Sequence, residues 1–173
     1  NLSGYFHVGN GTRQGGILSP YLFSRYLREL LSQIVHHGIG CNIGGKFCNV
    51  LAYADDIVLL APCWDALQCL IKVLYRAAND INMTCNVTKT VCMVFKPTVK
   101  RYVIANEFPQ FCIGDKKLEF VSEFRYLGQI VNNRFSDDDD LKREMRNLFM
   151  RTNILIQRYS RCSENVKLVL FRA

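Results

Sequence analysis

The chain has 173 residues, of which 49% are hydrophobic, so it is large and apolar enough to bury a core, which excludes a disordered chain. Its 22 Lys and Arg residues outnumber its 15 Asp and Glu residues and give a net charge of +7, a balance that favours polyanionic partners without identifying one. Charged or polar residues interrupt every apolar run before the roughly 20 residues that a membrane-spanning helix needs. The opening residues from Asn1 lack the features of a signal peptide, so we expect a globular segment of a longer chain that is not secreted.

The eight cysteines show no Cys-x-x-Cys spacing of the kind that zinc sites and redox motifs use. We therefore expect reduced thiols, most of them buried.

The first third of the chain predicts a strand, a loop and a long helix. Tyr5–Val8 alternates like a strand, and the glycine-rich loop of residues 9–16 follows it. Ser19 is placed to cap a helix that runs to His37, with Pro20 at its first position. Paired apolar residues recur every four positions and predict one buried face, formed by Leu22, Phe23, Tyr26, Leu27, Leu30, Leu31, Ile34 and Val35.

The middle of the chain predicts two successive strand turns and a second helix. Residues 41–43 and 46–53 form a hairpin around Gly44-Gly45, and the chain turns at Asp55-Asp56 into a strand at residues 57–60. A helix then opens at Asp65, and its apolar set follows a 3.6-residue period: Leu67, Leu70, Ile71, Leu74, Ala78 and Ile81.

The remainder predicts strands and one further helix. We expect a strand at residues 90–95, a hairpin of residues 111–113 with 118–121, and a strand at residues 124–131. A last helix spans residues 141–161, and we interpret the run Asp137–Asp140 as an acidic helix start rather than a calcium loop. The fold class is α+β, an antiparallel sheet covered by helices on one face and followed by a helical segment.

The pair Asp55-Asp56 predicts chemistry because it lies between two apolar strands, at the rim of a sheet. Two magnesium ions about 3.5–4 Å apart can catalyse phosphoryl transfer when clustered carboxylates hold them. The alternative interpretation is a plain polar turn, which Asp also favours.

A longer motif, Gly11-Thr12-Arg13-Gln14-Gly15-Gly16-Ile17-Leu18-Ser19-Pro20, stands upstream of Tyr53-Ala54-Asp55-Asp56. Together they resemble the reverse transcriptases of non-LTR retrotransposons. Two further motifs of that family follow in order, a lysine-bearing motif at Asn86-Val87-Thr88-Lys89-Thr90 and a primer grip at Phe124-Arg125-Tyr126-Leu127-Gly128. The basic helix after residue 140 resembles the start of a thumb, so the likeness covers essentially the whole chain.

The resemblance implies a role for each matching residue. Asp55 would bind metal directly, Asp56 would support it, and Lys89 would protonate the leaving pyrophosphate, a role that requires a lowered pKa. Arg13, Gln14, Gly15 and Tyr53 would lie beside the template and the incoming nucleotide. Tyr126, Leu127 and Gly128 would hold the 3′ end of the primer, while Arg143, Arg146 and Arg151 would contact phosphates. An exposed lysine and a solvated basic face remain the alternatives for Lys89 and for these arginines.

The resemblance also implies an architecture and partners. We expect a polymerase palm at residues 1–121, a primer-grip hairpin region at 122–136 and the start of a thumb at 137–173. The expected cofactor is Mg²⁺, as two ions in the complete enzyme, and the expected partners are an RNA template, a DNA primer, deoxynucleoside triphosphates and the rest of a polyprotein. The family analogy places the protein in the nucleus or cytoplasm.

Relatives use one more aspartate, on a strand before the Gly-x-x-Gln-Gly loop, and this sequence begins after that motif. We therefore expect residues 1–173 alone to be inactive as an RNA-directed DNA polymerase. Two other interpretations stay open: a nucleic-acid-binding remnant of a retrotransposon that no longer polymerises, and an unrelated basic α+β domain. Group II intron relatives share several of these motifs, so they remain an alternative source.

Overall fold

The fold was analysed in a computed structural model, which describes residues 14–96 and 107–172. The strand expected at Tyr5–Val8 lies outside the described residues. The chain divides into two compact units, one of Asn1–Val91 with Ala105–Glu119 and one of Cys92–Ile104 with Phe120–Ala173. Helices and short antiparallel strand pairs make up both units, which confirms a mixed helix and strand fold.

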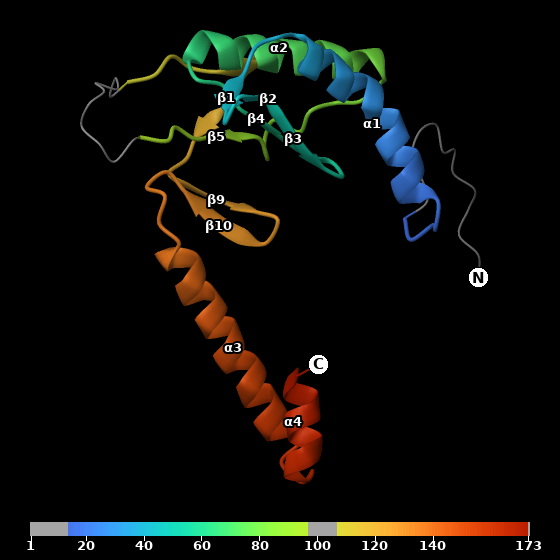
Figure 1. The fold of residues 1–173 in the computed structure, drawn as a ribbon, viewed down its shortest axis with the longest axis vertical. Helices are drawn as coiled ribbons and strands as arrows, with labels where there is room; N and C mark the ends of the chain where they lie inside the picture. Colours follow the sequence, from blue (N-terminus) through green and yellow to red (C-terminus); the bar gives the residue numbers. More distant parts are fainter. Residues whose placement is uncertain (1–13, 97–106, 173) are drawn as a thin grey trace. The chain divides into compact units, whose positions relative to one another are not determined.

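The first unit is built on two helices that pack against a hairpin. The helices are α1 (Ser19–His36) and α2 (Trp64–Asp80), and the hairpin consists of β3 (Val50–Tyr53) and β4 (Asp56–Leu59). Both helices lie on the same side of these strands (Figure 1). The unit also contains the antiparallel pairs β1 (Cys41–Ile43) with β2 (Lys46–Cys48) and β6 (Cys112–Ile113) with β7 (Lys116–Lys117).

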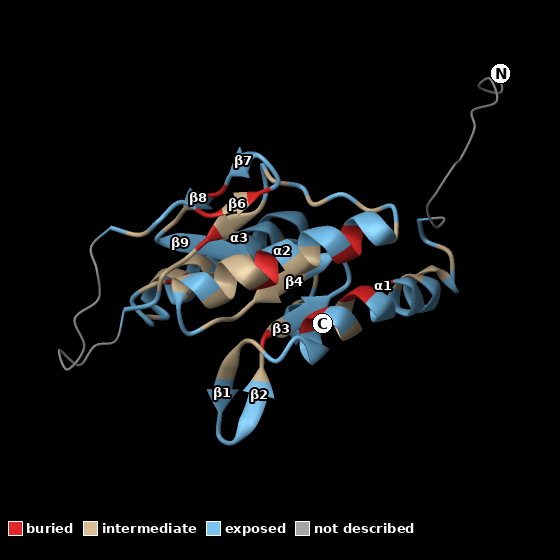
Figure 2. Ribbon diagram, turned by 90° about the horizontal axis from the view of Figure 1, so that it is seen from above, coloured by how far each residue is buried: buried red, intermediate tan, exposed pale blue. Residues whose placement is uncertain are grey.

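The core of this unit lies between the two helices and the hairpin. Figure 2 marks the buried positions of α1 and α2 in red. The buried cluster consists of Leu27, Leu30, Ile34, Leu70, Ala77 and Ala78, against which Val50, Ile57 and Leu59 of the hairpin pack. The hairpin is therefore fixed by apolar contacts on one face.

Two details of α1 differ from the expectation. Leu18, not Ser19, precedes the helix, no side chain caps it, and Pro20 is its second residue, where a missing N–H still costs nothing because the first four lack helical partners. The buried face is also narrower than predicted, since Leu22, Tyr26 and Val35 are 52%, 41% and 48% exposed. The second helix and the β3–β4 hairpin cover only part of the surface of α1, so these side chains stay exposed.

The second helix of the unit is fixed to β6 by its first turns. The side-chain amide of Gln68 donates to the Cys112 carbonyl and accepts from the Cys112 N–H, both at 3.2 Å. Trp64 stacks on Phe111 with ring centroids 5.9 Å apart. These contacts confirm a helix that packs on strands, as its period predicted.

The second unit contains a hairpin and two helices. The hairpin is β9 (Glu123–Tyr126) with β10 (Gln129–Asn132), and the helices are α3 (Asp138–Arg158) and α4 (Glu164–Arg172). The single strand expected over residues 124–131 is thus wrong, because Leu127 and Gly128 adopt positive φ and reverse the chain. The expected last helix ends at Arg158 rather than residue 161, and α4 was not predicted. Neither α3 nor α4 has a buried residue among the residues described.

Two other strand predictions are only partly right. Strand β5 covers Val91–Cys92 rather than residues 90–95, and its partner is β8 (Glu119–Phe120). Leu118 continues the hairpin, since its N–H donates to the Phe111 carbonyl at 2.9 Å, but residues 119–120 leave it and form β8, which pairs with β5. A strand extends only as far as the neighbouring strand that pairs with it, and an alternating sequence pattern does not reveal where that neighbour ends.

The cysteines are free, but the prediction that most are buried is wrong. Cys92 is buried, Cys63 is exposed and the other six are half-buried. Burial raises the pKa of the Cys92 thiol to about 11, so this group stays protonated at neutral pH. Among the described residues, no helix is both long enough and apolar enough to cross a bilayer.

Candidate active site

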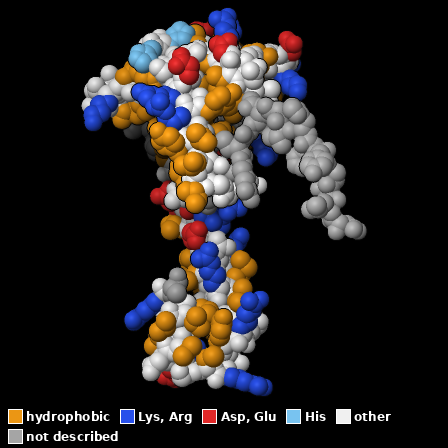
Figure 3. Space-filling model, turned by 90° about the vertical axis from the view of Figure 1, so that its right-hand side faces the viewer, with side chains coloured by type: hydrophobic (Ala, Val, Ile, Leu, Met, Phe, Trp, Pro, Cys, Tyr) orange, Lys and Arg blue, Asp and Glu red, His pale blue; other side chains and the backbone are white. Residues whose placement is uncertain are grey.

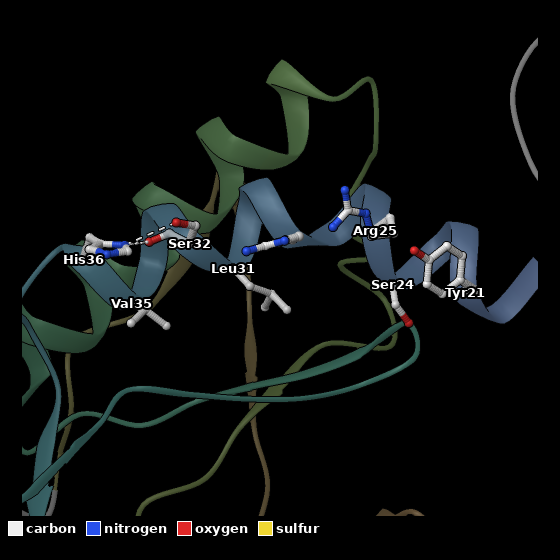
Figure 4. Close-up of a pocket in the computed structure, with 8 residues that line it drawn as sticks. Tyr21, Ser24, Arg25, Leu31, Ser32, Val35 and His36 are labelled. Carbon is white, nitrogen blue, oxygen red and sulfur yellow. Dashed lines mark hydrogen bonds between the residues drawn. The ribbon is translucent and has the colours of Figure 1, made fainter.

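The Asp55-Asp56 pair lies at the tip of the β3–β4 hairpin, as predicted from the sequence. Tyr53 pairs with Asp56, so Ala54 and Asp55 form a two-residue turn and Asp56 is the first residue of β4. The strands behind this turn pack on the core of the first unit, which fixes the position of the tip. In Figures 1 and 4 the tip points toward the end of the unit where α1 begins.

The turn itself is strained. Ala54 has a φ of 52°, in the left-handed region that glycine favours. A residue with a Cβ adopts this conformation at a cost of roughly 1–2 kcal/mol. Non-glycine residues in this region cluster at functional sites, where surrounding structure enforces the conformation.

Both carboxylates at the tip are available to a ligand. Asp55 and Asp56 are exposed, and within the described parts of the chain neither side chain has a hydrogen-bond or ion-pair partner. Tyr53, next to the turn, is 65% exposed. Carboxylate oxygens are the hard donors that magnesium prefers.

Two carboxylates alone do not make up the ligand set of a divalent ion. Residues 14–96 and 107–172 contain no group of three or more His, Cys, Asp or Glu side chains that could hold an ion. Asp55 and Asp56 therefore fit a divalent ion as two members of a larger carboxylate set.

The predicted template loop leads into α1. Arg13 lies outside the described residues. Gln14 is exposed, and Gly15 has a φ of 76°, so the turn requires a residue that tolerates the left-handed region. The Ser19 N–H donates to the Gly16 carbonyl at 3.1 Å, which joins the loop to the helix.

Lys89 lies in a tight turn that Asn86 organises. The Asn86 carbonyl accepts from the backbone N–H of Lys89 at 3.1 Å and of Thr90 at 3.0 Å. Its side-chain oxygen accepts from the Thr88 hydroxyl at 2.7 Å and again from the Lys89 N–H at 3.3 Å. The exposed Lys89 side chain thus projects from a fixed backbone.

The predicted primer grip is the turn of the β9–β10 hairpin. Tyr126 pairs with Gln129, and the turn residues Leu127 and Gly128 have φ values of 47° and 89°. Leu127 is half exposed. Like Ala54, it is a non-glycine residue in the left-handed region at the tip of a hairpin.

The three predicted phosphate-binding arginines differ in their surroundings. Arg143 is 21% exposed and pairs with Asp140 at 2.8 Å and Glu144 at 2.6 Å. Arg146 and Arg151 are exposed, and neither has an ion-pair partner among the described residues. Figure 3 shows Lys and Arg side chains mixed with apolar ones on the surface of α3 and α4.

The predicted residues fall into two groups. Gln14, Gly15, Tyr53, Asp55, Asp56 and Lys89 belong to the first unit, and Tyr126, Leu127, Gly128, Arg143, Arg146 and Arg151 belong to the second. Sequence reasoning missed that Asn86 organises the Lys89 turn. The available signal was an Asn three residues before Lys89, because Asn side chains accept hydrogen bonds from nearby backbone N–H groups. It also missed Asp140, whose place in an acidic run hid its contacts.

A shallow groove elsewhere does not belong to this site. It follows the outer face of α1 (Figure 4), and within residues 14–96 and 107–172 only α1 side chains line it, among them Tyr21, Arg25, Arg28 and His36. None of the predicted site residues that the structure describes lines it.

The chain belongs to the reverse transcriptase (RNA-dependent DNA polymerase) family, whose pattern matches residues 1–131. It is 29% identical over 126 residues to the Retrovirus-related Pol polyprotein from type-2 retrotransposable element R2DM of Drosophila melanogaster, an alignment that covers 71% of this chain and 12% of that protein. It is 27% identical over 133 residues to the Retrovirus-related Pol polyprotein from type-1 retrotransposable element R2 of Nasonia vitripennis, covering 75% of this chain and 13% of that protein. An R1 polyprotein of Nasonia vitripennis is 26% identical over 127 residues, covering 68% and 28%.

These matches confirm the predicted family and the predicted likeness to non-LTR retrotransposons. The chain spans about an eighth of the length of the R2 polyproteins that it matches.

Proposed function

We propose that these residues form the palm and the start of the thumb of a retrotransposon reverse transcriptase, which copies RNA into DNA by two-metal nucleotidyl transfer. The family match and the R1 and R2 relatives support this activity. The observation that carries the proposal is the hairpin tip, where two exposed carboxylates, without a partner among the described residues, stand at the end of strands packed against the core. In this assignment residues 1–121 are palm, 122–136 hold the primer grip and 137–173 begin the thumb.

Asp55 would hold a magnesium ion, with Asp56 as a supporting ligand. When bound, paired divalent ions activate the attacking hydroxyl and neutralise charge on the leaving group. The core-packed strands would keep Asp55 in place without reorganisation during the reaction, which is the condition for effective electrostatic stabilisation.

The other residues of the first unit would serve the incoming nucleotide. Lys89, presented by the Asn86 turn, would donate a proton to the leaving pyrophosphate oxygen. Gln14 and Gly15 would border the template and the nucleotide, since glycine lets a backbone approach a ligand closely. Arg13 and Tyr53 complete this assignment.

The second unit would hold the primer. Tyr126, Leu127 and Gly128 would position its 3′ end, and the exposed guanidinium groups of Arg146 and Arg151 would contact backbone phosphates. Such contacts give affinity without sequence preference. The proposed partners are therefore an RNA template, a DNA primer, deoxynucleoside triphosphates and the remainder of a polyprotein.

The test is Asp55→Asn in the complete polypeptide, compared with Asp115→Asn. Both residues are exposed carboxylates in two-residue hairpin turns of the first unit, so the two variants differ chiefly in the proposed metal role. Magnesium-dependent addition of nucleotides to a DNA primer on an RNA template should fall about a thousandfold in Asp55→Asn, because loss of a metal ligand removes several kcal/mol of transition-state stabilisation.

Asp115→Asn should keep the activity of the unaltered protein. Equal rates in the two variants would contradict the proposal. Tight binding of primer and template without any incorporation by the unaltered protein would instead support a binding remnant.

A further inference from the structure

The backbone N–H of Ile130 points away from its own hairpin. Tyr126 and Gln129 flank the two-residue turn and therefore exchange both ladder hydrogen bonds, so the next pair, Arg125 with Ile130, is not hydrogen-bonded. Such an outward donor on an edge strand needs another partner. It finds one in the Asp140 carboxylate of α3, which accepts the bond at 2.8 Å.

Asp140 is itself held by Arg143. The Asp140 oxygen that accepts from Ile130 also accepts from Arg143 Nε at 2.9 Å and lies 2.8 Å from Arg143 Nη2. The hydrogen bond from Ile130, followed by the one from Arg143, lowers the pKa of Asp140, so the carboxylate stays ionised. Arg143 is one-fifth exposed and is also paired with Glu144.

The link between β10 and α3 is fixed by a second residue. Asn132 is 4% exposed. Its side-chain oxygen accepts from the N–H groups of Arg134 and Ser136, both at 3.1 Å, and its amide donates to the Ser136 carbonyl at 2.6 Å. The hairpin and the first turn of α3 are thus joined by short, local contacts.

We propose that Asp140, braced by Arg143, is a positioning residue for the primer: it fixes the β9–β10 hairpin, whose Leu127-Gly128 turn holds the primer's 3′ end. This inference rests on the proposed function and deepens it. Arg143 then serves the hairpin, while the exposed Arg146 and Arg151 are left for phosphates. The Ile130 contact lies two residues from Gly128, so a small shift of the strand moves the turn directly.

The experiment compares Asp140→Ala with Asp138→Ala in the complete polypeptide. Both changes remove a carboxylate from the first turn of α3, but the Asp138 side chain bonds Ser136 and not the hairpin. Hydrogen–deuterium exchange of peptides covering residues 129–132 reports whether the hydrogen bond from Ile130 to Asp140 is formed. The burst of single-nucleotide addition reports how well the primer's 3′ end is positioned. Its amplitude counts active molecules, and its rate is measured per active molecule.

We expect exchange of these peptides to rise about tenfold in Asp140→Ala, as loss of a hydrogen bond to a charged group implies. The burst rate should fall about tenfold or more, since small misplacement of a reacting group is costly. Asp138→Ala should leave both unchanged. A lower amplitude at an unchanged rate in Asp140→Ala would show a purely structural residue and overturn the inference.

Unchanged exchange in Asp140→Ala would likewise contradict the claim that Asp140 fixes the β9–β10 hairpin. Absence of any burst from the unaltered protein would refute the proposed function, and the inference about the primer would fall with it. Faster exchange in Asp140→Ala would then still show that Asp140 fixes the hairpin, because exchange does not depend on polymerase activity. The two failures can therefore be told apart.

Discussion

Asn49 is a buried polar residue at the junction between β2 and β3. It is 2% exposed, and its side-chain amide donates to the Ile34 carbonyl in the last turn of α1 at 2.7 Å. The Ile34 carbonyl also accepts from the His37 N–H at 3.3 Å, so the Asn49 amide is its second donor at the end of α1. Gly40 allows the close approach, because a Cβ there would lie 2.4 Å from the Asn49 Cβ.

Replacing Asn49 with Ala should destabilise the first unit by about 0.5–1.5 kcal/mol, because the buried Ile34 carbonyl loses one of its two donors while the Cβ packing is retained. Asn42→Ala is the matched control. The Asn42 side chain is exposed and, among the described residues, accepts only from the Gly45 N–H at 3.1 Å, so its loss should cost less. Urea unfolding, followed by the fluorescence of Trp64, the single tryptophan, measures the free energy of unfolding of both variants. Equal losses would contradict the role of Asn49.

At the scale of elements, the junction of β10 and α3 should respond to acid. The Ile130 and Arg143 hydrogen bonds lower the pKa of Asp140 in the folded protein, with a further contribution from Arg125. The unfolded chain therefore binds a proton more readily than the folded one. The contribution to stability is present above the unfolded pKa of about 3.9, and it is lost as the pH falls through the lower folded pKa.

The measurement is thermal unfolding of the unaltered protein and of Asp140→Asn, at neutral pH and at about pH 3. The unaltered protein should unfold at a higher temperature at neutral pH, and the difference should shrink in acid as Asp140 becomes protonated. A difference that does not change with pH would show that this carboxylate does not contribute through its charge.

Local patterns predicted the elements better than their pairing. The 3.6-residue period identified α1 and α2, and Gly44-Gly45 and Asp55-Asp56 identified hairpins, because these signals lie within a few residues. The apolar pattern did not indicate the turn at Leu127-Gly128, since leucine rarely adopts a positive φ and the apolar run continues through it; only the family resemblance suggested a hairpin region at residues 122–136. The pairing of β8 with β5 joins residues far apart in sequence, which no local pattern encodes.

At the scale of the whole molecule, motifs predicted the family but not the detailed surroundings of the site. Asp55 and Asp56 lie at a hairpin tip and Lys89 in a tight turn, positions that suit the roles proposed for them. The apolar period of the chain predicted where the core of the first unit lies. It could not reveal that Arg143 is occupied by Asp140, because an ion pair depends on side-chain geometry.

The burial pattern of the first unit suits the catalytic role proposed for it. Its helices bury Leu30, Ile34 and Leu70 almost completely, and the strands that carry Asp55 pack on them. Interiors of this kind are close-packed and resist displacement. A metal ligand mounted on such strands would keep its position through repeated rounds of nucleotide addition.

The most direct test of the central claim, that Asp55 ligates a catalytic metal ion, is the metal dependence of Asp55→Cys. Nucleotide addition with Mg²⁺ should fall about a thousandfold, because magnesium binds a thiolate poorly. Replacement of Mg²⁺ by Mn²⁺ or Cd²⁺ should restore activity at least about tenfold, since softer ions accept sulfur, whereas Asp55→Ala should not be rescued. Full activity of Asp55→Cys with Mg²⁺ would contradict the claim.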